Sequence, residues 1–240
     1  SVFNVTRVIG PAVAGLLIAA VGTAACFFVN AASYLAVLWM LAIMRPPFAG
    51  ASTALAGRST FRDGWRYIMD TAEPRLLTLL TITFSVFGFS FAPMLPVYAS
   101  QVLGAGATGY GALMSGVGVG AAAAALFVAA MGHRVHREGR VFAFATLFGL
   151  VLLVTSLAGH FVPALLLLTL AGCSWALTGI LTNTILQTKA PDHLRGRVMG
   201  VRMFAIATMP PGVLAAGWLI QQAGVSVTLV LFAAAGALLT

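Results

Sequence analysis

The sequence predicts an all-α integral membrane protein built as a bundle of eight transmembrane helices. Hydrophobic residues make up 60% of its 240 residues and charged residues only 8%, a composition that would leave a soluble domain with too little polar surface. Four stretches contain no Asp, Glu, Lys or Arg: residues 8–44, 76–133, 141–188 and 203–240. Because each is long enough for two spans of about 17 to 25 residues and has a polar or Gly-rich midpoint, we expect four helical hairpins.

The cations predict how these hairpins are oriented. Twelve of the thirteen Lys and Arg residues lie in three loops, at 45–75, 132–140 and 188–202, whereas the hairpin tips carry no formal charge. Cationic loops collect on the cytoplasmic side of a membrane. We therefore expect a multi-pass protein of the cytoplasmic (inner) membrane, and the net charge of +8 indicates topology rather than a nucleic-acid partner.

The third loop holds four cations, which are Lys189, Arg195, Arg197 and Arg202. Pro191 and Gly196 interrupt regular backbone within the same stretch. Because four cations do not sit in hydrocarbon, the stretch from Lys189 to Arg202 is predicted to be a short loop at the membrane surface.

The first hairpin holds one cation and two polar residues on its second helix. Arg7 lies fifteen residues from the tip at Gly22, roughly 22 Å into a hydrocarbon core about 30 Å thick. It is either a snorkelling arginine or a cation that faces a cavity. Asn30 and Tyr34, one helical turn apart, form either structural hydrogen bonds or part of the same cavity wall.

A linker and a short amphipathic helix are predicted for residues 45–75. The Ala/Gly/Ser-rich run up to Ser59 indicates a flexible linker. Thr60 and Asp63 have the spacing of a helix-capping box. The helix that follows has an apolar stripe of Phe61, Trp65, Ile68 and Met69 opposite Arg62 and Arg66. We expect it to lie on the inner leaflet, with contact to a partner protein as the alternative.

The helix expected over residues 76–100 carries an aromatic stripe of Phe84, Phe87, Phe91 and Tyr98. At 100° per residue these side chains fall within about 60° of one another. They either line a cavity for an amphipathic molecule or contact lipid and neighbouring helices. Pro93 and Pro96 are expected to kink the helix near its outer end.

Small residues at helical spacing predict close packing in two other helices. The helix after residue 106 presents the row Ala112, Gly116, Gly120 and Ala124. The first helix of the chain contains Gly10, Pro11 and Gly15. Such rows let neighbouring backbones approach, and Pro11 should bend its helix.

An internal repeat indicates the domain organisation. A shift of 202 residues superposes Gly10, Ala14, Gly15, Leu17, Ile18 and Gly22 on Gly212, Ala216, Gly217, Leu219, Ile220 and Gly224. Six spans separate the copies, so both run in the same direction and a six-helix parallel repeat follows. Residues 1–44 would then be the last two helices of an N-terminal half-bundle, 45–75 a cytoplasmic linker and 76–240 the six-helix C-terminal half-bundle. Four further helices would precede Ser1, giving twelve.

Three loop and helix motifs carry a family resemblance. Gly132, Arg137, Gly139 and Arg140 fit the pattern G-x-x-x-D-R-x-G-R, with His136 in place of the acid, and Pro191, Arg195, Gly196 and Arg197 fit P-x-x-x-R-G-R. Gly10-Pro11-x-x-x-Gly15 is similar to the antiporter motif of a fifth helix. Together they resemble the major facilitator superfamily, and within it the prokaryotic branch of enterobactin exporters and macrolide-efflux proteins.

The resemblance implies a secondary active transporter that exports a small amphipathic molecule, drug-, macrolide- or siderophore-like, by alternating access. It also implies that a proton gradient, and no cofactor, drives export. The candidate substrate-binding residues are Asn4, Arg7, Asn30, Tyr34, Phe84, Phe87 and Phe91. The candidate cytoplasmic gate consists of Gly132, His136, Arg137, Gly139, Arg140, Pro191, Arg195, Gly196 and Arg197. All five acids lie in predicted cytoplasmic loops, so a proton carrier at mid-membrane would have to come from other helices.

Other classes of protein remain as alternatives. A lysolipid or metabolite carrier of the same fold fits the sequence, as does a membrane scaffold or sensor that transports nothing. An enzyme is not expected, because the acids and histidines are scattered over separate loops. His136 and Glu138 lack further converging ligands, so no metal site is predicted either. The sequence does not indicate an oligomeric state.

Overall fold

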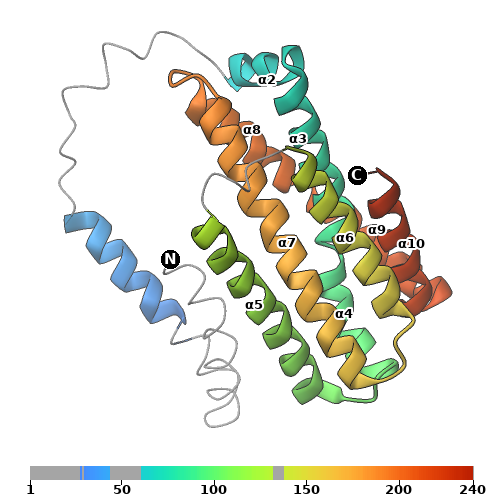
Figure 1. Ribbon diagram of the computed structural model, residues 1–240. Helices are drawn as coiled ribbons and strands as arrows, with labels where there is room; N and C mark the ends of the chain where they lie inside the picture. The colour runs from blue at the N-terminus through green and yellow to red at the C-terminus, as the bar shows by residue number, and fades with distance from the viewer. Residues whose placement is uncertain (1–27, 29, 44–60, 132–137, 240) are drawn as a thin grey trace.

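The computed structural model describes residues 28, 30–43, 61–131 and 138–239, which are helical apart from short turns (Figure 1). Five helical stretches in this part of the chain are long and apolar enough to cross a membrane: Ala72–Gln101, Gly106–Met131, Gly139–Ser156, Phe161–Lys189 and Arg195–Ala223. Asn30–Ile43 and Val225–Leu239 are shorter apolar helices, and the first predicted span, before the tip at Gly22, lies outside the described residues. The predicted all-α membrane fold is confirmed.

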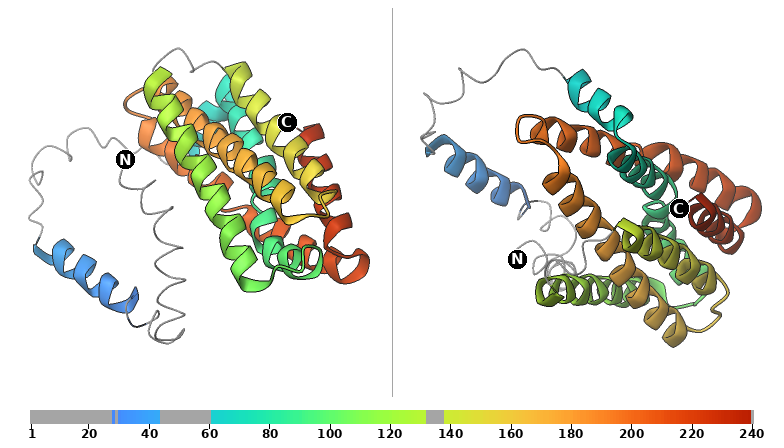
Figure 2. Two further views of the ribbon diagram at one scale, coloured as in Figure 1. Left: turned by 60° about the horizontal axis from the view of Figure 1, so that its bottom comes forward. Right: turned by 45° about the horizontal axis from the view of Figure 1, so that its top comes forward.

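The helices from residue 61 onward form one bundle (Figures 1 and 2). In chain order they are α2 (Phe61–Asp70), α3 (Ala72–Thr83), the π-helix η1 (Phe84–Gly88), α4 (Phe91–Gln101), α5 (Gly106–Met131), α6 (Glu138–Ser156), α7 (Phe161–Lys189), α8 (Arg195–Ile206), α9 (Met209–Ala223) and α10 (Val225–Leu239). Helix α7 lies between α5 and α6, and α6 packs on α10. The start of α3, the end of α7 and the start of α8 lie at one end of the bundle, which we call the charged end because it holds Glu73, Lys189, Asp192 and Arg195.

Helices α5 and α7 pack backbone against backbone through glycine. A Cβ atom added at Gly120 would lie 1.9 Å from the carbonyl oxygen of Thr169, and one added at Gly172 would lie 2.2 Å from that of Val117. At Gly116 an added Cβ would lie 2.8 Å from the Thr169 hydroxyl. The row of small residues on α5 is therefore the surface that meets α7, because only glycine leaves room for the neighbouring backbone.

The membrane span Ala72–Gln101 is interrupted at residues 84–90. Within η1 the Phe89 N–H donates to the Phe84 carbonyl, five residues back, at 3.1 Å, and the chain then turns before α4 begins. Pro93 has no N–H with which to bond to the Phe89 carbonyl, so one α-helical hydrogen bond is missing directly after the interruption. The interruption precedes both prolines, and α4 continues through Pro96.

One part of the bundle's core lies between α4, α5, α6 and α7. Tyr98, Leu113, Phe148 and Leu168 are buried there. The Tyr98 hydroxyl donates to the carbonyl oxygens of Thr155 at 2.6 Å and Ala158 at 2.8 Å. These bonds satisfy carbonyl groups at the end of α6 and fix α4 against it.

Helix α2 starts at Phe61, and its apolar stripe contacts α8 of the same chain, which was not expected from the sequence. Ile68 is fully buried, the Phe61 ring meets Phe204 edge-on with centroids 6.3 Å apart, and a Cβ added at Gly64 would lie 2.7 Å from Arg197 Cβ. Contact with α8 therefore covers part of the stripe, because Phe61 and Trp65 remain exposed. The predicted cap residue Thr60 lies outside the described residues.

Candidate functional site

A cavity of about 510 Å³ lies between α3, α7 and α8. Its walls comprise Leu80, Thr81, Phe84, Phe89, Ala121, Trp175, Ala176, Thr178, Gly179, Ile180, Thr182, Asn183, Arg202 and Ile206. Half of these belong to α7, whose stretch from Trp175 to Asn183 turns a broad face toward the cavity. A second cavity, about 10 Å³, has room for little more than one water molecule.

Three aromatic rings form the apolar wall of the large cavity. Phe89 meets Trp175 edge-on, with centroids 5.3 Å apart and ring planes at 81°. Phe84 meets Phe89 in the same way at 6.5 Å and 88°. Edge-to-face contacts hold such rings in defined orientations, so the wall offers a fixed surface for a flat apolar group.

Helix α7 also contributes three polar residues to the cavity wall: Thr178, Thr182 and Asn183. Thr178 Oγ1 donates to the Ser174 carbonyl at 2.9 Å, as Thr81 Oγ1 on α3 does to the Leu77 carbonyl at 2.7 Å. These hydroxyls keep lone pairs that can accept hydrogen bonds, and the Asn183 amide can both donate and accept. No Asp or Glu is among the cavity-lining residues.

Arg202 lies in the cavity wall, so the prediction that it belongs to a surface loop is wrong. It lies in α8, seven residues after Arg195, and its Nη2 is 3.5 Å from the Gly179 carbonyl oxygen. The loop ends earlier than expected because α8 begins at Arg195, directly after the turn at Leu194. The cavity gives the guanidinium an environment other than hydrocarbon at this depth.

The predicted substrate-binding residues are dispersed in the structure. Phe84 lines the large cavity, Phe87 lines the small one and packs on Phe232 at 5.5 Å, and Phe91 is buried in the core against Phe148 at 5.6 Å. Two more, Asn30 and Tyr34, lie on the helix Asn30–Ile43, whose described residues are all exposed. Outside the described residues are Asn4, Arg7, Gly10, Pro11 and Gly15.

The predicted gate residues on the third loop contact helix ends and loop backbone. Arg195 Nε donates to the Gln187 carbonyl, in the last turn of α7, at 2.8 Å, and its Nη2 lies 2.7 Å from Asp192 Oδ1. Arg197 Nη1 donates to the His193 carbonyl at 2.7 Å. Pro191 accepts the N–H groups of Leu194 and Arg195 at 2.9 Å, and Gly196 is exposed. Gly139 and Arg140 are exposed on α6, while Gly132, His136 and Arg137 lie outside the described residues.

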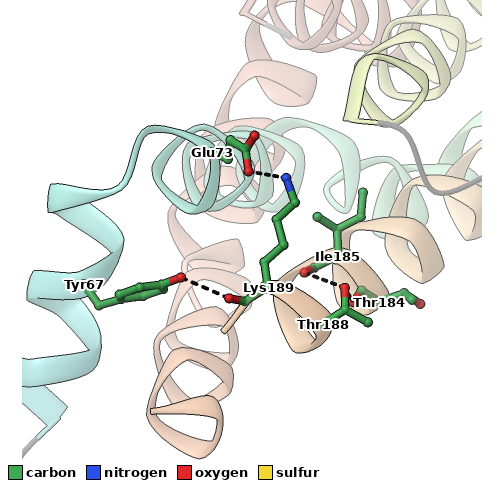
Figure 3. Close-up of polar contacts among 6 residues, drawn as sticks. All are labelled: Tyr67, Glu73, Thr184, Ile185, Thr188 and Lys189. Carbon is green, nitrogen blue, oxygen red and sulfur yellow. Dashed lines mark hydrogen bonds and ion pairs between the residues drawn. The ribbon is translucent and has the colours of Figure 1, made fainter. Parts of the chain in front are cut away.

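A second set of contacts at the charged end joins three helices (Figure 3). Lys189 of α7 forms an ion pair with Glu73 of α3, and its carbonyl accepts the hydroxyl of Tyr67 from α2 at 3.2 Å. Thr188 Oγ1 donates to the Thr184 carbonyl at 2.9 Å. The sequence analysis did not predict this junction, because it placed Glu73 and Lys189 in two separate loops. Their opposite charges at the ends of two spans were the feature of the sequence that could have indicated the ion pair.

All 240 residues match the family model of transmembrane secretion effectors in the major facilitator superfamily. The chain belongs to this family. Membership of this family indicates a transport protein rather than an enzyme. The family and the apolar helices together indicate a multi-pass protein of the cell membrane. Within the described residues, no group of three or more His, Cys, Asp or Glu could hold a metal ion.

The curated relatives of this family member are efflux pumps by name. The multidrug efflux pump Tap of Mycolicibacterium fortuitum is 28% identical over 240 residues, which cover 95% of this chain and 57% of the relative. The multidrug efflux pump Tap of Mycobacterium tuberculosis (strain ATCC 25618 / H37Rv) is 28% identical over 236 residues, which cover 95% of this chain and 55% of the relative. The chain thus spans a little over half the length of these relatives.

Proposed function

We propose that the protein exports small amphipathic molecules across the cytoplasmic membrane, and that the cavity between α3, α7 and α8 is one wall of its substrate site. Residues 76–240 act as the C-terminal half-bundle, and the opposite wall comes from the N-terminal half. The observation that carries the proposal is the cavity itself, supported by the efflux function in the relatives' names.

The size and lining of the cavity suit such a substrate. Its volume of about 510 Å³ falls within the range of about 300 to 1,000 Å³ that small-molecule sites occupy. Phe84, Phe89 and Trp175 offer an apolar surface, while Thr182, Asn183 and Arg202 offer hydrogen-bonding groups. A wall that is mostly apolar with a few polar groups accepts molecules that share a polarity pattern rather than one shape.

The transport cycle that we propose is alternating access driven by a proton gradient. The contacts of Arg195 and Arg197, together with the Glu73–Lys189 pair, form and break as the charged end closes and opens. Because none of the cavity-lining residues is Asp or Glu, we place the proton carrier outside the lining of this cavity.

Filling the cavity tests the proposal. A Cβ at Gly179 would meet no other atom within 4 Å, so Gly179→Leu places its side chain in the cavity without a backbone clash. An extra apolar group in a binding pocket changes affinity by about tenfold, so export of a fluorescent amphipathic dye should fall by about that factor. Export is measured with the protein expressed from its complete reading frame, in inverted membrane vesicles energised by a proton gradient.

Gly217→Leu is the matched control. Gly217 is exposed on α9, and a Cβ there also meets nothing within 4 Å. This variant should export the dye at the unsubstituted rate. Equal export by both variants would contradict the assignment of the cavity, and an unsubstituted protein that moves no dye across a range of charges and sizes would favour a scaffold or sensor.

A further inference from the structure

Arg202 is the one charged residue among those that line the cavity. The proposed export of amphipathic molecules does not by itself require a cation at this place. A charged side chain inside a membrane span is energetically costly, so its position needs a partner or a function.

The guanidinium of Arg202 does not reach back toward the charged end. Arg195 Nε bonds to the Gln187 carbonyl, so the end of α7 and the start of α8 lie at the same level. The Arg202 Cα lies about 10 Å along α8 from Arg195, at 1.5 Å per residue. Gly179, whose carbonyl oxygen its Nη2 approaches, lies about 12 Å along α7 from Gln187 by the same measure. The side chain therefore stays at about the depth of its own backbone, whereas a snorkelling arginine would reach back toward the surface.

The hydrogen-bonding capacity of Arg202 is largely unused. Its Nε is buried and has no hydrogen-bond partner among the described residues. The contact of Nη2 with the Gly179 carbonyl, at 3.5 Å, is at the long limit for a hydrogen bond. A guanidinium carries five N–H donors in a planar fork that matches the two oxygens of a carboxylate. A free fork beside a cavity without an acid in its wall is a site for an anionic acceptor.

We propose that Arg202 anchors a carboxylate of the transported molecule, so that the site prefers aromatic or amphipathic acids over their neutral or cationic derivatives. This inference rests on the proposed export function. The carboxylate accepts from the free fork of Arg202, and the apolar body lies on the wall of Phe84, Phe89 and Trp175.

Asn183 completes the anchor. It lies four residues after Gly179 on α7, and residues four apart are neighbours on one helix face. Its amide is therefore next to the carbonyl that Arg202 approaches, and its Nδ2 can donate to the second oxygen of a bound carboxylate. Arg202 supplies the charge and Asn183 a neutral donor. Arg202 should therefore contribute more than Asn183 to the preference for an acid over its neutral derivative.

The test compares two dyes that differ only at one group: a xanthene dye with a free benzoate and the methyl ester of the same dye. Binding to the purified full-length protein in detergent is measured by fluorescence anisotropy. The unsubstituted protein should bind the acid more tightly. Arg202→Gln should weaken binding of the acid by about tenfold, as expected for loss of a charge-assisted hydrogen bond, and leave binding of the ester unchanged.

Two further variants separate this role from a structural one. Arg202→Lys keeps the charge without the planar fork, so it should retain part of the preference for the acid. Arg66→Gln, at an exposed position on α2, removes the same charge from the protein and should change neither affinity. Thermal unfolding of all variants shows whether the bundle is intact.

The other outcomes overturn the anchor. Equal weakening of both dyes by Arg202→Gln would mean that Arg202 pairs with an acid elsewhere in the protein, and unchanged binding of both would mean that it does not contact the ligand. No preference of the unsubstituted protein for the acid would also contradict the proposal. Transport is measured separately in proteoliposomes: Arg202-dependent binding of a dye that is never moved would support the anchor while contradicting export.

Discussion

At Gly120 the backbone of α5 lies so close to the backbone of α7 that no side chain larger than a hydrogen atom fits between them. The 1.9 Å that would remain between an added Cβ and the Thr169 carbonyl oxygen is far below any van der Waals contact, and the obstacle is backbone rather than a flexible side chain. Either α5 and α7 separate or the substitution is not accommodated. The identity of this one residue thus sets the distance between two membrane helices.

We expect Gly120→Ala to destabilise the bundle by about 1 to 3 kcal/mol, the usual effect of overpacking. The measurement is thermal unfolding of purified protein in detergent. Gly111→Ala is the control on the same helix, because a Cβ at Gly111 would meet nothing within 4 Å. If both variants unfolded at the same temperature, the close approach of α5 and α7 would be absent from the folded protein.

Arg202 marks the limit of prediction at the residue scale. The rule that places cations at the membrane surface depends on hydrocarbon as the surrounding medium. It therefore held for Lys189, Arg195 and Arg197, which lie at helix ends rather than in the predicted loop, but not for Arg202. A cavity forms only when α3, α7 and α8 come together, so nothing local in the sequence indicated it. Trp175 and Asn183 were missed for the same reason: a Trp and an Asn on an apolar helix are equally compatible with packing.

In the span Ala72–Gln101, the π-helix η1 changes which side chains share a face of the helix. The stripe of Phe84, Phe87, Phe91 and Tyr98 assumed 100° per residue throughout, but η1 contains a five-residue bonding pattern in place of the four-residue one. One extra residue in a turn rotates everything after it by about 100°. Phe84 consequently remains at the cavity, whereas Phe91 and Tyr98 lie in the core. The helix could be predicted from its hydrophobic composition, and its internal rotation could not.

The α7–α8 junction leads to a prediction about gating. Lys substitution at Arg195 and Arg197 keeps both charges but removes the planar fork that donates to the Gln187 and His193 carbonyls. Stability should change by less than about 1 kcal/mol, because these side chains are partly exposed. Dye export by the double variant should fall about threefold or more if the fork closes the gate.

The double variant Arg62→Lys, Arg66→Lys is the control for this gate, since it makes the same chemical change on α2. Its dye export should match that of the unsubstituted protein. Undiminished export in the Arg195→Lys, Arg197→Lys variant would show that these arginines only mark topology.

At the scale of the whole molecule, hydrophobic composition and the spacing of charges were sufficient to predict an all-α membrane bundle. The charge-free stretch 141–188 became α6 and α7, divided at residues 157–160 near the expected tip. The positions of charged residues at span ends depend on the bilayer rather than on tertiary contacts. The order and length of the spans can therefore be predicted from the sequence. The docking of α2 on α8 could not be predicted in this way, because it depends on the surfaces of both helices.

The orientation of the bundle in the membrane is a separate prediction. We expect the charged end to face the cytoplasm and the end at Gly224 to face outward. In a background where Cys26 and Cys173 are replaced by Ser, Gln222→Cys should react with an impermeant maleimide in intact cells and Asp192→Cys should not. Labelling of Asp192→Cys with protection of Gln222→Cys would show the opposite orientation.

The two ends of the bundle differ in the kind of force that holds them. At the end with Gly224, successive helices are joined by turns of a few residues, such as 102–105 and 157–160, in which no residue carries a formal charge. At the other, the exposed Glu73–Lys189 ion pair joins α3 to α7 in addition to the covalent connections. Dissolved ions screen exposed pairs over a Debye length of about 8 Å at physiological ionic strength, but they leave turns and apolar packing unaffected. The ionic strength of the compartment that bathes the charged end therefore changes the contribution of this ion pair, while the contact of α2 with α8 persists.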